Sequence, residues 1–220
     1  MKRLAIFAFY NGNGLINDYV VTYLEYLKEV SDSIIFVADN EPNVKDLSKI
    51  FQLVSHIESY HHGEYDFGSY KIGFKYAKEH YLLDDVDEII LCNDSCFCVD
   101  SLKPAFDKMG TKSCDFWSMT ASNEYELHLQ SFFLVVKKNL FSSELFSNYL
   151  NNVKHLDNFL EIVKTYEIPL KKTFEQKGYK GNSFIKAPEK FNPTFFPIKC
   201  MKAKMPLVKR KIFTESHACK

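Results

Sequence analysis

The chain has 220 residues, of which 28 are basic and 28 acidic, so its formal net charge is zero. A balanced charge creates no overall field that would attract nucleic acid, and nucleic acid is therefore not an expected partner. The length suffices for one domain with a large hydrophobic core. No apolar run reaches the length of a membrane span, and the short run after Met1 leads into a polar loop instead of a signal-peptide cleavage site. These features predict a cytoplasmic protein.

The first part of the chain alternates between apolar runs and helical patterns. Apolar runs at 4–9, 34–37 and 54–57 predict strands, and the spacing of apolar residues predicts helices over 17–30 and 44–53. Strands and helices that alternate over short links are typical of a mostly parallel sheet with helices on both faces. The sequence therefore predicts a Rossmann-type α/β fold.

Polar residues and glycines follow the first two predicted strands. Tyr10, Asn11 and Gly12 come after the first strand, and Asp39 comes after the second. Ligands of open α/β sheets bind outside the carboxyl ends of the strands, and a glycine lets the backbone approach a ligand closely. These four residues are candidates for ligand binding.

The stretch EIILCNDSCFCVD, residues 88–100, forms the centre of the prediction. Its apolar residues 89–92 predict a buried strand, and the polar triplet Asn93, Asp94 and Ser95 follows directly. Carboxylate, amide and hydroxyl oxygens are hard ligands that suit Mg²⁺ or Mn²⁺ carrying a diphosphate. An Asx turn that ends a strand is the alternative interpretation.

A helix is predicted from about Phe67 to His80, with Asp66 at the position of its N-cap. Gly68 lies in the first turn and Lys71 one turn further. The N-terminus of a helix presents free N–H groups and a positive dipole end, which favour a phosphate. An ordinary capping aspartate is the alternative.

Two later strands carry further candidates. The run 114–120 predicts a strand that contains Asp115 and Trp117. The run 126–136 begins with alternation, which places His128 and Gln130 on one face, where they can contact sugar hydroxyls. Two polar residues on a half-exposed strand would explain the same pattern.

A helix is predicted over 156–178, and Pro169 interrupts it because the residue before a proline leaves the α region. Glu167 lies at this break, which is a common place for a functional carboxylate. A solvated charge is the alternative interpretation.

The end of the chain is basic and rich in apolar residues. From Lys190 onward there are eight Lys or Arg residues and one acid, Glu215. Such a segment can pack on the domain or touch an anionic membrane surface. We therefore expect one domain over 1–190 and a basic, apolar segment over 191–220 that packs on it or faces a membrane.

Six short motifs follow one another along the chain: YDFGSYKIGF, LCNDSCF, DFWSMT, HLQSFFLVVKK, YEIPLKKTFEQKGY and MPLVKRKIF. In this order they resemble the rhamnan synthesis protein F family of glycosyltransferases, and the resemblance covers roughly Tyr60 to Phe213. The family is associated with transfer of L-rhamnose or related sugars onto bacterial surface polysaccharides, and its fold is expected to be GT-A-like.

The resemblance implies specific roles. Asp94 takes the part of the DxD-type aspartate that binds the metal, although many GT-A enzymes have two acids here and this chain has one. The donor pocket would contain Asp66, Gly68 and Lys71 beside Asn93. Trp117, His128 and Gln130 would border the sugar or the acceptor.

The chemistry implied is substitution at an anomeric carbon, with a nucleoside diphosphate leaving. If the reaction inverts configuration, a carboxylate must accept the proton of the attacking hydroxyl, and Glu167 and then Asp115 are the candidates. The resemblance implies dTDP-L-rhamnose as donor, for which an apolar pocket of Phe67, Phe97 and Trp117 would suit the methyl group. The acceptor would be a lipopolysaccharide or surface polysaccharide, reached from the inner face of the membrane.

Two other classes remain open. A nucleotidyltransferase would share the α/β crevice but would need several carboxylates for its metals. A catalytically inactive sugar-binding module on the same fold would tolerate the single acid at Asp94.

Overall fold

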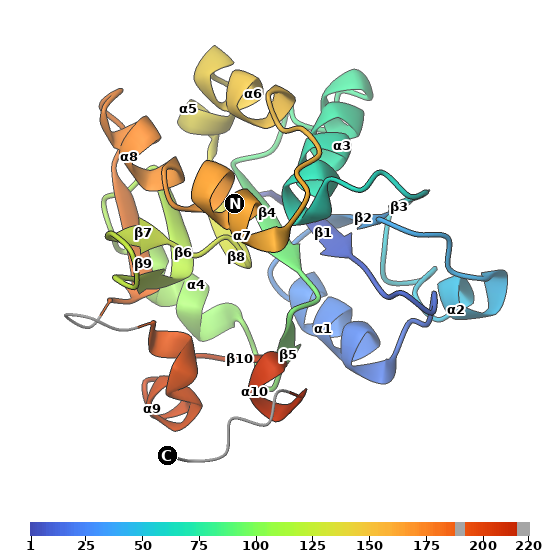
Figure 1. Ribbon diagram of the computed structural model, residues 1–220. Coiled ribbons are helices and arrows are strands. Elements are labelled where there is room, and N and C mark those ends of the chain that lie inside the picture. The colour runs from blue at the N-terminus through green and yellow to red at the C-terminus, as the bar shows by residue number, and fades with distance from the viewer. Residues whose placement is uncertain (188–191, 215–220) are drawn as a thin grey trace.

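A computed structural model describes residues 1–187 and 192–214. Its main sheet contains β1 (Arg3–Phe9), β2 (Ser33–Ala38), β3 (His56–Ser59), β4 (Glu88–Asn93), β6 (Phe116–Ser122), β7 (His128–Leu129), β8 (Phe133–Lys137) and β9 (Gly181–Ile185). The strand order is β3-β2-β1-β4-β8-β6-β7, with β9 also paired to β6. Figure 1 shows this sheet with β1 and β4 at its centre.

The strands that carry the polar residues run in one direction. β1 pairs in parallel with β2 and β4, and β2 pairs in parallel with β3. β8 is antiparallel to both β4 and β6, so β6 runs parallel to β4. The predicted mostly parallel α/β sheet is confirmed, and the carboxyl ends of β1, β2 and β4 meet at one edge.

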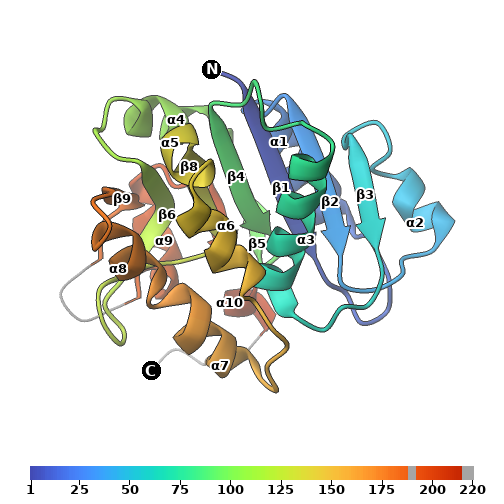
Figure 2. The ribbon, with the colours of Figure 1, turned by 90° about the horizontal axis from the view of Figure 1, so that it is seen from above.

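Helices cover both faces of the sheet (Figure 2). Residues of α1 (Asp18–Lys28), α4 (Lys103–Gly110) and α9 (Pro197–Lys202) belong to one core cluster. The other cluster contains residues of α3 (Tyr65–Glu79), α5 (Lys138–Phe141), α6 (Glu144–Asn151) and α8 (Leu170–Glu175). Alternate residues of β1 point to opposite faces: Phe7 belongs to the first cluster and Ile6 to the second. A short helix, α2 (Val44–Ser48), follows β2.

The amino end of α3 lies close to the sheet edge where the site forms. The helix begins at Tyr65, with Glu64 as its N-cap residue, so the prediction that Asp66 is the N-cap was wrong and Asp66 lies in the first turn. A glycine is needed at position 73, because a Cβ atom there would collide with Ile6 of β1. This close packing brings the first turn of α3 beside the end of β4.

Two predicted elements are broken in the structure. The strand predicted over 126–136 is divided into β7 and β8, and the connection between them carries Gln130 and Ser131. The helix predicted over 156–178 consists of α7 (Phe159–Ile162), a π-helical turn (Val163–Glu167) and α8. The prediction that the residue before Pro169 leaves the α region was wrong, because Ile168 and Pro169 both have helical dihedral angles. The irregularity is the π-helical turn itself, and Glu167 lies at its end.

The described part of the C-terminal segment packs on the domain. After a 3₁₀ turn (Pro193–Phe195) and α9, the strand β10 (Leu207–Lys209) pairs antiparallel with β5 (Cys96–Cys98), and α10 (Lys211–Thr214) follows. Figure 1 shows β10 and β5 side by side. Cys200, Met205 and Leu207 are buried in the same cluster as α1. The predicted boundary between residues 190 and 191 lies outside the described residues, as do Lys190, Glu215 and Lys220 of the basic tail.

Among the helices of the described residues, none is both long and apolar enough to cross a membrane.

Candidate functional site

Two adjoining cavities lie along the edge where β1, β2 and β4 end. The first, here named the β2 cavity, has a volume of about 450 Å³ and is lined by Tyr10, Asp39, Asp66 and Asp94 among others. The second, here named the β7 cavity, has about 430 Å³ and is lined by His128, Gln130, Glu167 and Lys209 among others. Ser95, Phe159 and Arg210 line both cavities. The two cavities therefore form one continuous cleft, with these three residues at the junction.

Asp94 lies next to Ser95 and Arg210 of this junction and is held by Tyr19 and Arg210. Its Oδ2 accepts hydrogen bonds from the Tyr19 hydroxyl and from Nη1 of Arg210, both at 2.8 Å. The same guanidinium nitrogen donates to the Asp94 carbonyl at 3.1 Å. Asp94 is only 7% exposed, and this burial raises the pKa of its carboxyl group, while Tyr19 and Arg210 oppose the rise. The predicted carboxylate is thus part of a formed ion pair inside the cleft.

The surroundings of Asp94 do not fit a dedicated divalent-metal site. Among the described residues there is no group of three His, Cys, Asp or Glu side chains placed to hold a metal ion. A Mg²⁺ or Mn²⁺ ion on Oδ2 would also lie beside the positively charged guanidinium of Arg210, 2.8 Å from that oxygen. The donor set therefore matches an ion pair with arginine better than an octahedral oxygen cage.

Asn93 links the end of β4 to the first turn of α3. Its Nδ2 donates to Oδ2 of Asp66 at 2.5 Å, and its Oδ1 accepts from the Ser95 backbone N–H at 3.1 Å. Burial, followed by the neighbouring Asp94 carboxylate, raises the pKa of Asp66 to about 7. Asp66 therefore changes its charge near neutral pH, within the wall of the cleft.

Asp39 organises the loop that closes the far end of the β2 cavity. Its Oδ1 accepts from the backbone N–H groups of His62 at 2.7 Å and Gly63 at 2.8 Å. Three aromatic rings are exposed at this cavity: Tyr10 is 57% and Phe159 59% exposed, and Tyr65 is also exposed. Exposed rings around a cavity offer flat apolar surfaces for a planar or a sugar ring.

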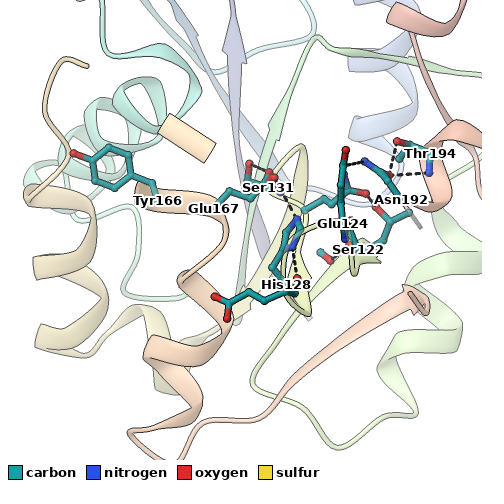
Figure 3. A network of polar contacts seen from close by, with 12 residues as sticks. Ser122, Glu124, His128, Ser131, Tyr166, Glu167, Asn192 and Thr194 are labelled. Atoms are coloured by element: carbon teal, nitrogen blue, oxygen red, sulfur yellow. Dashed lines mark hydrogen bonds and ion pairs between the residues drawn. The ribbon is translucent and has the colours of Figure 1, made fainter. Parts of the chain in front are cut away.

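Glu167 carries the polar network of the β7 cavity (Figure 3). Its Oε2 accepts from the backbone N–H of Ser131 at 2.7 Å and from the Ser131 hydroxyl at 2.5 Å. Its Oε1 lies 3.7 Å from Nε2 of His128. Nδ1 of His128 faces the carbonyl oxygen of Glu126 at 2.7 Å, so this nitrogen carries a proton. One carboxylate oxygen is therefore fixed by Ser131, and the other is directed at the imidazole.

A smaller cavity of about 70 Å³ lies between the carboxylates of Asp66 and Glu167. It is lined by Asp66 and Glu167 together with Asn93, Ser131 and Lys209. The side chain of Gln130 supports the β7 cavity nearby, since its Oε1 accepts from the Thr120 hydroxyl at 2.7 Å. His128 and Gln130 both line the β7 cavity, but not as one face of a strand, because β7 ends at Leu129 and Gln130 lies in the connection that follows.

Lys71 and Gly68, predicted to lie in the donor pocket, do not line either large cavity. The ammonium group of Lys71 forms an ion pair with Glu64 and donates to the Val153 carbonyl at 3.0 Å. Gly68 is required by packing, because a Cβ atom there would lie 2.9 Å from Nδ1 of His62 and collide with Glu64. Both residues hold the loop before α3 instead of facing the cleft.

Asp115 and Trp117 also lie away from the cleft. Asp115 precedes β6, at the sheet edge opposite the carboxyl ends, and its carboxylate accepts from Nδ2 of Asn139 at 2.6 Å and from the backbone N–H of Lys180 at 2.7 Å. Trp117 is a core residue whose ring packs on Phe106 and Phe133. The geometry therefore removes Asp115 as a base and Trp117 as a sugar contact.

Asn11, Gly12 and the predicted apolar pocket also do not contribute to the two large cavities. Asn11 accepts from Nδ2 of Asn40 through its carbonyl at 2.6 Å, and neither it nor Gly12 lines the cavities. A Cβ atom at Gly12 would meet only the Tyr10 hydroxyl, at 3.8 Å, so no close approach requires a glycine there. The expected apolar pocket for a methyl group does not form, because Phe67 lines the small cavity and Phe97 packs on Tyr19.

Three residues of the cleft were missed from the sequence. Tyr19 donates to Asp94, while Lys209 and Arg210 come from the C-terminal segment. Nζ of Lys209 donates to Oγ of Ser95 at 2.8 Å and lies 4.1 Å from the centre of the Phe132 ring. The available signal was the basic triplet that follows the apolar pair Leu207 and Val208; it belongs to the motif MPLVKRKIF and to the basic tail, but neither assigned Lys209 or Arg210 to the site.

The fold is similar to that of solved enzymes. A 4-diphosphocytidyl-2C-methyl-D-erythritol synthase superposes with a TM-score of 0.53 at 12% identity, covering 91% of this chain and 97% of that one. A cytidylyltransferase from Leptospira borgpetersenii gives a TM-score of 0.47 at 13% identity over 87% and 78% of the two chains. At these identities the similarity concerns the fold alone, and the superposition on the synthase is the one that supports the same fold.

The sequence has no significant match among the curated proteins. The family model described as rhamnan synthesis protein F matches residues 34–220, which is most of the chain and includes the residues that line the two cavities other than Phe9 and Tyr10. The motifs that suggested this family therefore lie within one continuous match, and the chain belongs to the rhamnan synthesis protein F family.

Proposed function

We propose that the protein is a glycosyltransferase that moves a sugar from a nucleoside-diphosphate donor to a glycan acceptor. The observation that carries this proposal is the two-part cleft, in which cationic side chains at the junction separate an aromatic cavity from a cavity with a carboxylate. The β2 cavity would hold the nucleoside, the junction would hold the diphosphate, and the β7 cavity would hold the sugar and the acceptor.

The β2 cavity suits a nucleoside. Tyr10 and Phe159 expose ring faces on which a base can stack, and Asp39 offers a buried carboxylate whose Oδ1 is already fixed by two backbone N–H groups. A carboxylate held in this way at the end of a parallel strand can accept hydrogen bonds from ribose hydroxyls. The exposed rings and the fixed carboxylate of this cavity therefore support a nucleoside as the bound group.

Glu167 is the proposed base. The acceptor oxygen forms a bond to the anomeric carbon while the bond from that carbon to the phosphate oxygen breaks, and its electron pair leaves with the nucleoside diphosphate. The hydroxyl proton passes to Oε1 of Glu167, because Oε2 is occupied by Ser131. His128, 3.7 Å from Oε1, can share that proton. This arrangement predicts inversion at the anomeric carbon, with no covalent intermediate on the protein.

The proposed sugar is L-rhamnose or another deoxysugar, with dTDP-L-rhamnose as donor. This proposal rests on the family, whose description names rhamnan synthesis. The acceptor would be a surface polysaccharide or lipopolysaccharide precursor, so we place the reaction on the cytoplasmic side of the cell membrane.

Contact with that membrane is proposed through α9 and its surroundings. Phe195, Ile198 and Met201 expose apolar side chains, and Lys199 and Lys202 add positive charge in the same segment. Anionic lipid attracts such basic segments by about 1 kcal/mol per charge, and apolar side chains strengthen the contact.

The test is release of nucleoside diphosphate from a panel of sugar nucleotides, measured with and without a rhamnose-containing polysaccharide acceptor. The proposal expects release that depends on the acceptor, with the sugar appearing in the polymer. Release of pyrophosphate from a nucleoside triphosphate would instead identify a nucleotidyltransferase. Binding of a donor without any turnover would identify an inactive sugar-binding module.

A further inference from the structure

Two cations near the junction, Lys209 and Arg210, come from the end of β10, whose position is fixed by its pairing with β5. β10 pairs with β5 in a register that sets Lys209 opposite Cys96, and the backbone N–H of Arg210 donates to the Ser95 carbonyl at 2.9 Å. The two side chains then reach Ser95 and Asp94, respectively. Lys209 and Arg210 therefore bring two cationic groups to Ser95 and Asp94, the last two residues of the polar triplet.

The other carboxylates near the junction, Asp66 and Glu167, are poorly suited to bind a metal ion together with Asp94. Asp66 accepts from Nδ2 of Asn93, and burial raises its pKa to about 7, so a proton competes for it at neutral pH. Glu167 is fixed by Ser131 and faces the imidazole of His128. The junction thus combines two permanent cations with one paired carboxylate, Asp94.

We propose that Lys209 and Arg210 neutralise the leaving diphosphate in place of a divalent metal ion. This inference rests on the proposed function, because it assigns the charge partner of that same donor. A guanidinium group offers several N–H donors in one plane and can bind a phosphate while it keeps its contact with Asp94. The ammonium group of Lys209 can exchange its hydrogen bond with Ser95 for one with a phosphate oxygen.

Such a site stabilises charge where it develops. When the bond from the anomeric carbon to the phosphate oxygen breaks, the negative charge on the diphosphate increases, and preorganised cations lower the energy of that state. Asp94 then acts as a positioning residue that orients Arg210, instead of as a metal ligand. Tyr19 supports the same orientation, because the guanidinium carbon lies 4.2 Å from the centre of its ring.

The experiment is calorimetric titration of the full chain with dTDP and with UDP, in excess EDTA and in excess MnCl₂. The proposal expects that whichever of them binds does so with affinities that agree within about threefold in the two conditions. Arg210→Ala and Lys209→Ala should each weaken binding by about tenfold or more, as truncation of a charged partner at a desolvated contact does. Lys202→Ala is the matched control, since it removes an exposed lysine of the same segment that lines neither cavity.

The possible results distinguish the metal-independent site from the glycosyltransferase proposal. Binding that EDTA weakens by about tenfold or more overturns the metal-independent site but leaves the glycosyltransferase proposal in place. Full affinity in both Ala variants also overturns it. Absence of binding in every condition overturns both proposals. Because Arg210→Ala leaves Asp94 unpaired, thermal unfolding is measured for each variant, and Lys209→Ala, which does not touch Asp94, decides the matter if Arg210→Ala fails to fold.

Discussion

Replacing Arg210 by alanine tests whether the ion pair at the junction is formed as described. The change removes the 2.8 Å contact with Oδ2 of Asp94, the bond to the Asp94 carbonyl and the contact with the Tyr19 ring. Breaking a buried pair by removing one partner typically costs about 3–5 kcal/mol. Because the Arg210 side chain is 30% exposed, water screens part of this interaction, and we expect a loss of about 2–3 kcal/mol in the free energy of unfolding.

The loss should depend on pH with a defined sign. Burial raises the pKa of Asp94 above its usual value, and Arg210 opposes that rise, so removing Arg210 raises the folded-state pKa further. A carboxyl group with a higher pKa in the folded chain binds more protons there than in the unfolded chain, so stability falls as the pH rises above the unfolded value. The variant should therefore be close to wild type near about pH 4 and lose most stability toward neutral pH.

Thermal unfolding at several pH values measures this. For a chain of this length a loss of 2–3 kcal/mol lowers the Tm by roughly 4–12 °C at neutral pH. Asp94→Asn combined with Arg210→Ala should recover most of the loss, because an amide needs no cation. A Tm unchanged by Arg210→Ala at neutral pH, or a loss that is equal at every pH, would refute the reasoning.

Three further predictions concern catalysis, pH and the membrane. Glu167→Gln should lower kcat by about 10²-fold or more, as loss of a general base does, while donor affinity changes little; Asp115→Asn is the control and should leave kcat unchanged. Asp66→Asn should bind nucleoside diphosphate a few-fold more tightly than wild type above about pH 7, where the Asp66 carboxylate is charged, and equally below it. Association with anionic liposomes should weaken as salt rises, and the double change of Lys199 and Lys202 to alanine should weaken it further, by about 1 kcal/mol per charge, in flotation assays.

The contrary results are equally specific. Near wild-type kcat in Glu167→Gln would remove Glu167 as the base. An affinity ratio between Asp66→Asn and wild type that does not vary with pH would show that Asp66 does not titrate near the ligand. Liposome binding that is absent at low salt would show that the exposed apolar residues of α9 do not contact membranes.

The strand-end residues of the site were predictable because their positions depend on local sequence patterns. A buried apolar run that stops at Asn93 and Asp94 marks the carboxyl end of a strand, and in a parallel sheet such ends lie at one edge with Tyr10 and Asp39. Glu167 was singled out because a break was expected before Pro169; it does line the β7 cavity, but the residue before the proline stays helical and a π-helical turn stands where the break was expected. The residues at the strand ends required only the direction of a strand.

The rest depended on pairings between distant segments. Arg210 reaches Asp94 across 116 residues, and no spacing in the sequence indicates the pairing of β10 with β5. Lys71 has the spacing of a phosphate ligand, but its partners Glu64 and Val153 come from a loop and a helix end that the sequence did not place.

The assignments of Trp117 and Asp115 to the site failed because the sequence pattern did not indicate the burial or the direction of β6. Every residue of β6 is buried, so its sequence could not show that Trp117 points into the core. Asp115 precedes a strand that runs parallel to β4, and a residue in that position lies at the edge opposite the site. The sequence did not indicate the direction of β6, because it did not show that β8 lies between β4 and β6 and is antiparallel to both.

The most direct test of the central claim is calorimetric titration of the chain with dTDP-L-rhamnose, UDP-glucose, UDP-N-acetylglucosamine and GDP-mannose. The account predicts that a nucleotide sugar binds, with dTDP-L-rhamnose tightest, and that Tyr10→Ala weakens binding by removing a ring of the β2 cavity. A UDP-hexose that binds about tenfold more tightly than dTDP-L-rhamnose would contradict the rhamnose assignment, since binding sites distinguish closely related substrates by about 1–3 kcal/mol. Failure of all four donors to bind at millimolar concentration, with or without Mn²⁺, would contradict the glycosyltransferase assignment itself.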